Sequence, residues 1–412
     1  MSRTVSSLSS TRPFALLRTA PAAARAVLHL LASLRHGRLD VHLPDGTSSR
    51  FGAADAAGTH AAIRLLNWNV CAAALKSGDI GFAESYIAGN WTTPDLPALL
   101  KLLVVNRDAV ERAVYGHWWG RWLYRAKHLL NRNSRRGSRK NIHAHYDLGN
   151  PFYCLWLDET MNYSSAWFDG DMTRSLPTAQ QAKVRRALAE CALQPGQHLL
   201  EIGCGWGALA ETAAREFGAQ VTGVTLSAEQ LAWGQERLAA AGLAGRTELR
   251  LQDYRDIDDA PFDAIASIEM FEAVGREYWP GFFATVRDKL KPGGRACIQS
   301  ITIRDDLFER YANGTDFIQQ YIFPGGLLPS PSQFRAHAQA AGLEVVNELA
   351  FGADYGETLR RWRERFLAQE ASVRRIGFDR RFTRIWEFYL AYCEAAFAGG
   401  NTNVIQFTLR KP

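Results

Sequence analysis

Apolar and polar residues in the first third of the chain follow short patterns typical of a small mixed domain. Residues 38–52 alternate apolar and polar side chains around a Pro-Asp-Gly turn, which predicts a β-hairpin. Strand and helix patterns continue through residues 61–68 and 77–106. We therefore expect a small α+β domain over residues 40–110.

From residue 178 onward, short apolar runs alternate with segments whose apolar residues recur at helical spacing. Such alternation predicts a doubly wound, mostly parallel α/β sheet. A KPGG sequence at 291–294 should end a helix and start a strand. The expected strands are 198–202, 220–226, 247–252, 262–269 and 295–303, and the expected helices are 178–192, 208–217, 228–241 and 277–290.

The end of the chain should complete this sheet. Residues 343–351 and 404–411 are apolar enough to form a closing antiparallel pair. Two long helices, at about 357–376 and 380–398, should lie between them. A chain of 412 residues is long for one core, so we expect two domains.

The first of these strands runs into a glycine-rich loop. The apolar run stops at Glu201, and Gly203, Gly205 and Gly207 follow at every second position. A dinucleotide loop reads G-x-G-x-x-G with an acid about 20 residues later for the ribose. Here the next strand ends at Thr225 and Ser227, without that acid. The E-x-G-x-G-x-G spacing instead resembles the first motif of S-adenosylmethionine-dependent methyltransferases, with a dinucleotide loop or a structural glycine turn as alternatives.

Composition places the chain among ordinary globular proteins. Hydrophobic residues make up 47% and charged residues 22%. The longest apolar stretch, at 26–34, is interrupted by His29 and is about half of the roughly 18 residues that a membrane span needs. The six cysteines form no C-x-x-C pair, so neither a metal site nor a disulfide framework is indicated, and a cytoplasmic location fits best.

The net charge of +6 comes from two basic segments. Residues 1–39 contain six arginines and no acid, and residues 112–146 contain nine Lys or Arg and no acid. Basic patches of this kind mark docking surfaces. The first segment has the composition of an organellar transit peptide, but an amphipathic helix from about Ala22 to Leu34, at the surface or against a membrane, is the simpler interpretation.

Residues 111–140 combine tryptophan with arginine. Trp118 and Trp122 fall on one side of a helix, and Arg121 and Arg125 on the other. This arrangement suits an anionic lipid surface. A packed interdomain helix followed by a solvated linker is an equal alternative, and nucleic acid is a third.

Nine stretches of residues 141–412 together resemble one protein family. They are NIHAHYDLGNPFY (141–153), YSSAWF (163–168), LLEIGCGWG (199–207), VTGVTLSAEQ (221–230), LQDYRD (251–256), MFEAVG (270–275), YIFPGGLLPS (321–330), FGADYGETLRRW (351–362) and YCEAAF (392–397). In combination they resemble the cyclopropane-fatty-acyl-phospholipid synthase family, which includes the mycolic acid cyclopropane synthases. The resemblance implies a seven-stranded class I methyltransferase sheet, and residues 40–110 look like the N-terminal domain of the phospholipid-acting members.

The resemblance also implies the contacts of S-adenosylmethionine. Tyr163 and Ser164 would close over the cofactor, the glycine loop would hold its amino-acid end, and Asp253 with Tyr254 would face the adenine. The complete implied set is Tyr163, Ser164, Glu201, Gly203, Cys204, Gly205, Trp206, Gly207, Thr225, Leu226, Ser227, Gln230, Asp253 and Tyr254.

The family's reaction moves the sulfonium methyl group to a cis double bond of a phospholipid acyl chain. An alkene needs no base for activation, but the resulting carbocation must lose a proton for the cyclopropane ring to close. In the family a bicarbonate ion accepts this proton. The resemblance places its ligands at Ser165, Glu272, Gln299, Ile301 and Tyr355.

Several of these positions depart from the family pattern. Ser165 and Gln299 stand where the best-known members have Cys and His, and Ala273 stands where many have His. Ser and Gln still donate hydrogen bonds but carry no positive charge. A cyclopropane remains the first expectation, a methylene- or methyl-branched chain is the alternative, and an inactive lipid-binding protein is the third.

Two further residues have competing interpretations. Glu272 is the leading catalytic candidate, because a buried carboxylate near an apolar site needs a partner or a task; a strand-end acid bonded to backbone is the alternative. Cys393 matches a cysteine once taken as catalytic in the family, although its apolar helical surroundings favour a structural role.

The implied substrate requires a membrane. Moving an acyl chain into water costs about 0.8 kcal/mol per methylene group, so the enzyme must dock on the bilayer. We expect a peripheral protein on the inner face of the membrane, with anionic lipids favoured, and family analogy suggests a homodimer. We expect no nucleic-acid partner, because the chain has neither an N/D-P-P-Y motif nor a Pro-Cys nucleophile pair.

Overall fold

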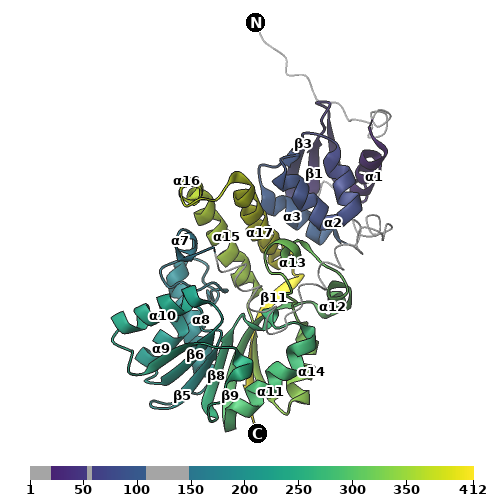
Figure 1. Ribbon diagram of the computed structural model, residues 1–412. Helices are drawn as coiled ribbons and strands as arrows, with labels where there is room; N and C mark the ends of the chain where they lie inside the picture. The colour runs from purple at the N-terminus through teal and green to yellow at the C-terminus, as the bar shows by residue number, and fades with distance from the viewer. Residues whose placement is uncertain (1–19, 53–57, 108–147) are drawn as a thin grey trace. The chain divides into compact units, whose positions relative to one another are not determined.

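The computed structural model describes residues 20–52, 58–107 and 148–412 (Figure 1). The chain divides into two compact units, Met1–Gly120 and Arg121–Pro412. The Trp/Arg segment expected at 111–140 and most of the basic segment 1–39 lie outside the described residues.

The first unit contains a four-stranded sheet with the strand order β2-β1-β3-β4. β1 and β2 form the expected antiparallel hairpin, and β1 also pairs in parallel with β3. Helix α1 begins at Ala22, as predicted, but ends before Leu34, whose side chain is buried. The elements are α1 (Ala22–Leu31), β1 (Arg38–His42), β2 (Ser48–Gly52), β3 (His60–Leu65), α2 (Asn69–Ile87), β4 (Trp91–Thr92) and α3 (Leu96–Val105).

The second unit contains a seven-stranded sheet with the order β10-β11-β9-β8-β5-β6-β7 (Figure 1). The strands from β9 to β7 are parallel, and β11 runs antiparallel to both β9 and β10. The predicted doubly wound seven-stranded α/β fold is therefore confirmed. The strands are β5 (His198–Ile202), β6 (Gln220–Thr225), β7 (Thr247–Leu251), β8 (Phe262–Ile268), β9 (Leu290–Ile303), β10 (Glu344–Ala350) and β11 (Thr402–Arg410).

Alternate strand residues point to opposite sides of the sheet. Helices pack against the buried residues on both sides. Leu199 packs with α8 (Leu176–Glu190), α9 (Ala208–Glu216) and α10 (Ala228–Ala240). Leu200, its neighbour, belongs to the opposite core with α11 (Trp279–Lys289) and α14 (Pro331–Ala340). The remaining elements are α7 (Asn150–Tyr153), η2 (Tyr254–Asp256), η3 (Phe271–Ala273), η4 (Arg276–Tyr278), α12 (Asp305–Ala312), α13 (Phe317–Tyr321), α15 (Gly352–Ala368), α16 (Glu370–Arg375) and α17 (Arg380–Ala398).

Two boundaries differ from the prediction. The KPGG sequence does not precede β9 but lies inside it, because fully buried Leu290 already pairs with Phe262 and the register then shifts before Arg295. The predicted helix 357–376 is two helices, α15 and α16, which meet at Gln369. α15 also starts earlier than predicted, where the Asn403 side chain accepts a hydrogen bond from the Gly352 N–H at 2.7 Å.

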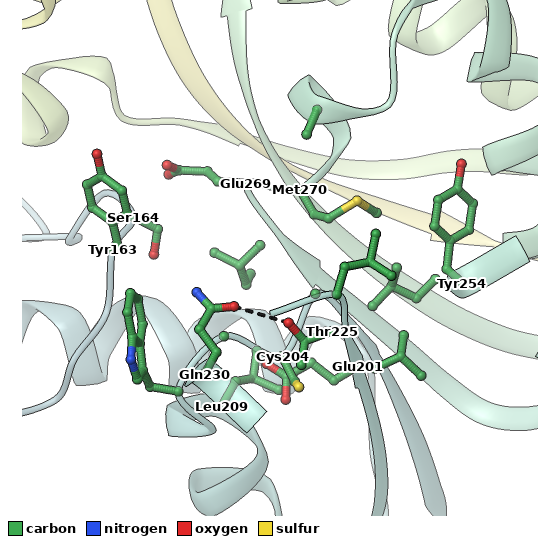
Figure 2. A pocket seen from close by; sticks show the side chains of 18 of the residues that line it. Tyr163, Ser164, Glu201, Cys204, Leu209, Thr225, Gln230, Tyr254, Glu269 and Met270 are labelled. Atoms are coloured by element: carbon green, nitrogen blue, oxygen red, sulfur yellow. Dashed lines mark hydrogen bonds between the residues drawn. The ribbon is translucent and has the colours of Figure 1, made fainter. Parts of the chain in front are cut away.

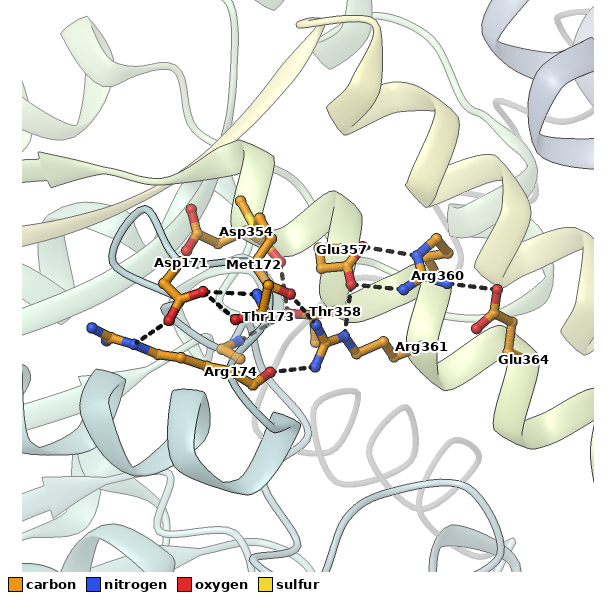
Figure 3. A network of polar contacts seen from close by, with 11 residues as sticks. Asp171, Met172, Thr173, Arg174, Asp354, Glu357, Thr358, Arg360, Arg361 and Glu364 are labelled. Atoms are coloured by element: carbon orange, nitrogen blue, oxygen red, sulfur yellow. Dashed lines mark hydrogen bonds and ion pairs between the residues drawn. The ribbon is translucent and has the colours of Figure 1, made fainter.

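Helix α15 holds the loop that follows Tyr163 (Figure 3). The Arg361 guanidinium donates to the carbonyl oxygens of Met172 and Arg174, both at 2.6 Å, and lies 4.5 Å from the Phe168 ring centroid. The Asp354 carboxylate accepts from the Phe168 N–H at 2.5 Å. These contacts fix the loop against the helix that carries Tyr355.

We predict that Arg361→Met lowers the free energy of unfolding by about 2 kcal/mol, because two loop carbonyls lose charged donors. Arg360→Met is the matched control. Among the described residues Arg360 pairs with Glu357 and Glu364 on its own helix, and its loss should cost about 0.5 kcal/mol or less. Denaturant unfolding measures both values. Equal losses in the two variants would contradict a loop-holding role for Arg361.

Candidate functional site

A pocket opens at the carboxyl ends of β5, β6 and β8, where ligands bind in doubly wound sheets (Figure 2). Two residues of the predicted cofactor set are not among its lining: Gly207 begins α9 in a left-handed conformation, and Ser227 caps α10. The others line this one pocket: Tyr163, Ser164, Glu201, Gly203, Cys204, Gly205, Trp206, Thr225, Leu226, Gln230, Asp253 and Tyr254.

The glycine loop needs glycine for its conformation and its packing. Gly203 has a φ of +85°, and a Cβ placed on it would lie 2.9 Å from Cγ of Met270. Gly207 has a φ of +81°, and its Cβ would lie 3.3 Å from Cα of Gly234. The loop therefore turns directly from β5 into α9 with its backbone open to the pocket.

Glu201 supplies a polar group that matches the predicted cofactor. Its Oε2 is buried and has no hydrogen-bond partner among the described residues. Burial raises the pKa of this carboxyl to about 8, and the charge of Lys183 opposes the shift. A buried oxygen without a partner is costly, so it suits a ligand with ammonium or hydroxyl groups, as S-adenosylmethionine has.

The polar residues at the ends of β6 and β7 are also fixed in place. Gln230 Oε1 accepts from the Thr225 hydroxyl at 3.1 Å (Figure 2). The Asp253 carboxylate is paired with the Arg255 guanidinium at 2.6 Å. Tyr254 lies across the pocket from Tyr163 and Glu269 in Figure 2. The pocket thus has a polar wall near β6 and a separate carboxylate near Tyr163.

That carboxylate belongs to Glu269, which the sequence reasoning missed. Glu269 Oε1 accepts from the Ser165 N–H at 2.9 Å and from Gln299 Nε2 at 2.7 Å. Its Oε2 accepts from the Tyr355 hydroxyl at 2.6 Å. The sequence does carry a signal, because Glu269 directly follows the apolar run of β8 and so lies at the same edge of the sheet as the glycine loop.

The five positions expected around bicarbonate do not form one cluster. Ser165, Gln299 and Tyr355 contact Glu269, as described above. Glu272 instead accepts from the Ile301 N–H and, at 3.2 Å, from the Ser300 hydroxyl. Glu272 is not among the pocket-lining residues, although its neighbour Ala273 on η3 is. Its catalytic role stays a prediction.

Cys393 is on α17 and is likewise not a lining residue. Burial raises the pKa of its thiol, so the thiol keeps its proton at neutral pH. A protonated thiol is a poor nucleophile. This environment supports the structural interpretation, and the catalytic one stays untested.

The two buried carboxyls of Glu269 and Glu272 favour a state with one negative charge over a state with two. Burial raises the pKa of both carboxyls, and the charge of Glu269 helps to raise that of Glu272 to about 8. At Glu269 this rise in pKa is opposed by the hydrogen bonds from Tyr355, Ser165 and Gln299 and by the charge of Lys183, whereas at Glu272 the neighbouring charge adds to it. At neutral pH we therefore assign the charge to Glu269 and the proton to Glu272.

We predict that Glu272→Gln changes how stability depends on pH. Because the folded pKa of Glu272 is about 8 and its ordinary value is 4.5, its protonated form stabilises the fold at low pH, and this contribution is lost as pH rises from 4.5 to 8. Glutamine mimics the protonated form. The variant should therefore lose less stability than wild type over this range, by several kcal/mol.

Denaturant unfolding at a series of pH values measures this difference. Glu236→Gln, at an exposed position of α10, makes the same atomic exchange as a control and should follow the wild-type curve. Parallel curves for Glu272→Gln and wild type would show that Glu272 does not hold a proton in the folded protein.

Comparison with known proteins identifies the family of this chain. Residues 133–407 match the family described as mycolic acid cyclopropane synthetase. The tuberculostearic acid methyltransferase UfaA1 of Mycobacterium tuberculosis is 41% identical, covering 81% of this chain and 79% of the relative. The cyclopropane-fatty-acyl-phospholipid synthase of Escherichia coli is 37% identical, covering 85% of this chain and 87% of the relative.

A solved structure shows the same fold with a ligand. The mycolic acid cyclopropane synthase CmaA1, complexed with SAH and CTAB, has a TM-score of 0.62 and 32% identity, covering 66% of this chain and 98% of that one. Its bound S-adenosylhomocysteine indicates that this chain binds S-adenosylmethionine. The chain belongs to the mycolic acid cyclopropane synthetase family, as an S-adenosylmethionine-dependent methyltransferase of the cyclopropane-fatty-acyl-phospholipid synthase type.

Proposed function

We propose that this enzyme methylates the cis double bond of an unsaturated acyl chain in a membrane phospholipid and forms a cyclopropane acyl chain. The observation that carries the proposal is a carboxylate at the end of the cofactor pocket, next to buried aromatic side chains. The E. coli relative, named a cyclopropane-fatty-acyl-phospholipid synthase, supports this substrate class.

The residues at this end of the pocket suit a cationic reaction. S-adenosylmethionine supplies an electrophilic methyl carbon when bound. The Tyr163 ring lies 5.4 Å from Trp156 and 5.5 Å from Trp362, centroid to centroid, and its hydroxyl is hydrogen-bonded to Tyr389 at 2.7 Å. Of this cluster, Tyr163 lines the pocket. Aromatic faces attract positive charge, so we propose that the Tyr163 ring, held by the other three side chains, stabilises the carbocation left on the acyl chain.

A second product is supported by a specific observation. Glu269 takes hydrogen bonds from three of the positions that the family resemblance assigned to bicarbonate, Ser165, Gln299 and Tyr355, so a side-chain carboxylate stands where the resemblance places an external anion. A relative at 41% identity is named a tuberculostearic acid methyltransferase. We therefore keep a methylene- or methyl-branched acyl chain as the second candidate product.

We also propose that the protein docks on the inner face of the membrane as a homodimer and favours anionic lipids. The support is the concentration of basic residues in 1–39 and 112–146 and the need to draw an acyl chain from the bilayer. Within residues 20–52, 58–107 and 148–412, no helix is long and apolar enough to span a membrane.

We predict that the purified protein, given S-adenosylmethionine and vesicles of cis-unsaturated phospholipid, yields acyl chains heavier by one methylene unit. Mass spectrometry detects the gain, and proton NMR distinguishes a cyclopropane from a branched chain of the same mass. Vesicles of saturated phospholipid are the control and should gain nothing. Cofactor binding without any mass gain would refute the proposal and favour an inactive lipid-binding protein.

A further inference from the structure

We infer that Glu269 is the proton acceptor of this enzyme and that its carboxylate occupies the position of the external anion expected from the family. The inference rests on the function proposed above. Three donors expected to hold bicarbonate, on Ser165, Gln299 and Tyr355, hold this side chain instead.

Glu269 is placed for contact with the reacting atoms. It lines the pocket together with Gly203 and Tyr163, which come from the glycine loop and from the loop held by α15. Its backbone has a φ of +50°, a conformation that costs a non-glycine residue roughly 1–2 kcal/mol. Such strain is retained at functional positions, and here it accompanies the turn that aims the carboxylate into the donor set.

A chain of hydrogen bonds orients the Gln299 amide towards Glu269. Arg186 donates to Gln406 Oε1 at 2.5 Å, and Gln406 Nε2 donates to Gln299 Oε1 at 3.0 Å. Because a guanidinium can only donate, it fixes the direction of both amides and leaves Gln299 Nε2 to donate to Glu269 at 2.7 Å. Glutamine thus supplies a neutral donor suited to a fixed carboxylate.

Bicarbonate does not fit this arrangement. The Ser165 N–H and the Tyr355 hydroxyl each have one proton to donate, and both protons go to Glu269. The surrounding ionisable groups are Glu201 and Glu272, whose carboxyls favour the neutral form, and Lys183, whose ammonium donates to the Ser164 hydroxyl at 2.6 Å. A second anion next to ionised Glu269 would be repelled at short range.

The proposed step balances without another reactant. The alkene electron pair forms the bond to the methyl carbon, the carbon–sulfur bond breaks with its electrons on sulfur, and a carbocation remains on the acyl chain. Glu269 then removes a proton. The electrons of the broken C–H bond close the three-membered ring or form a new double bond, and the neutral Glu269 returns its proton to solvent before the next turnover.

Two substitutions of Glu269 test the inference. E269Q keeps the size of the side chain but removes the base, so turnover should fall about 100-fold or more while S-adenosylhomocysteine binding, measured by calorimetry, stays at the wild-type level. E269G relieves the positive φ and opens the donor set. Added bicarbonate should raise both its turnover and its melting temperature.

The controls separate the possible outcomes. Wild-type turnover should be the same in carbon dioxide-free buffer and in bicarbonate, and A192G, which also removes a side chain at positive φ (+54°) but at an exposed site, should behave as wild type. Bicarbonate-dependent wild-type turnover, near-normal turnover of E269Q, or an E269G protein that does not respond to bicarbonate would overturn the inference. A wild-type protein that binds cofactor but methylates no lipid would instead refute the proposed function on which the inference rests.

Discussion

The arrangement of the site depends on one buried carboxylate and the hydrogen bonds it receives. Glu269 at the end of β8 is contacted from the loop after Tyr163 by Ser165, from β9 by Gln299 and from α15 by Tyr355. Burying a charge without such partners costs several kcal/mol. The charge therefore holds three distant segments together around a carboxylate that lines the pocket.

The antiparallel strand β11 is essential to this arrangement. Gln406 lies opposite Gln299 in the pairing of β11 with β9, and Arg186 reaches it from α8. A sheet made only of parallel strands with crossover helices would place no such partner next to Gln299. Strand β11, which lies between β9 and β10, thus supplies the Gln406 side chain that orients the Gln299 amide in the site.

A carboxylate that belongs to the chain has different consequences from a bound anion. An anion from solvent must bind before each reaction and can be positioned by several donors, whereas the Glu269 side chain is attached to β8 and restrained by backbone and side-chain contacts. Its place relative to the carbocation decides which proton is lost. Loss of a proton from the new methyl group closes the cyclopropane ring, whereas a hydride shift before the proton is lost gives a methylene-branched chain, so the same pocket and cofactor can serve either outcome.

Local patterns in the sequence determined much of the fold and the cofactor pocket. The strands on either side of the glycine loop, the hairpin of the first unit and most cofactor-lining residues follow from apolar periodicity, glycine spacing and the family resemblance, because each depends on residues close together in the chain. The boundaries at KPGG and at Gln369 did not follow, since pairing with Phe262 and packing decided them.

The choice between Glu269 and Glu272 was decided only by the tertiary structure. The two residues are neighbours in the sequence, and both follow the same buried strand, but the left-handed turn at Glu269 sends them to different partners. Those partners come from segments far away in the chain. The packing of β8, β9 and α15 decides which of the two glutamates accepts these hydrogen bonds. No local sequence pattern contains that information.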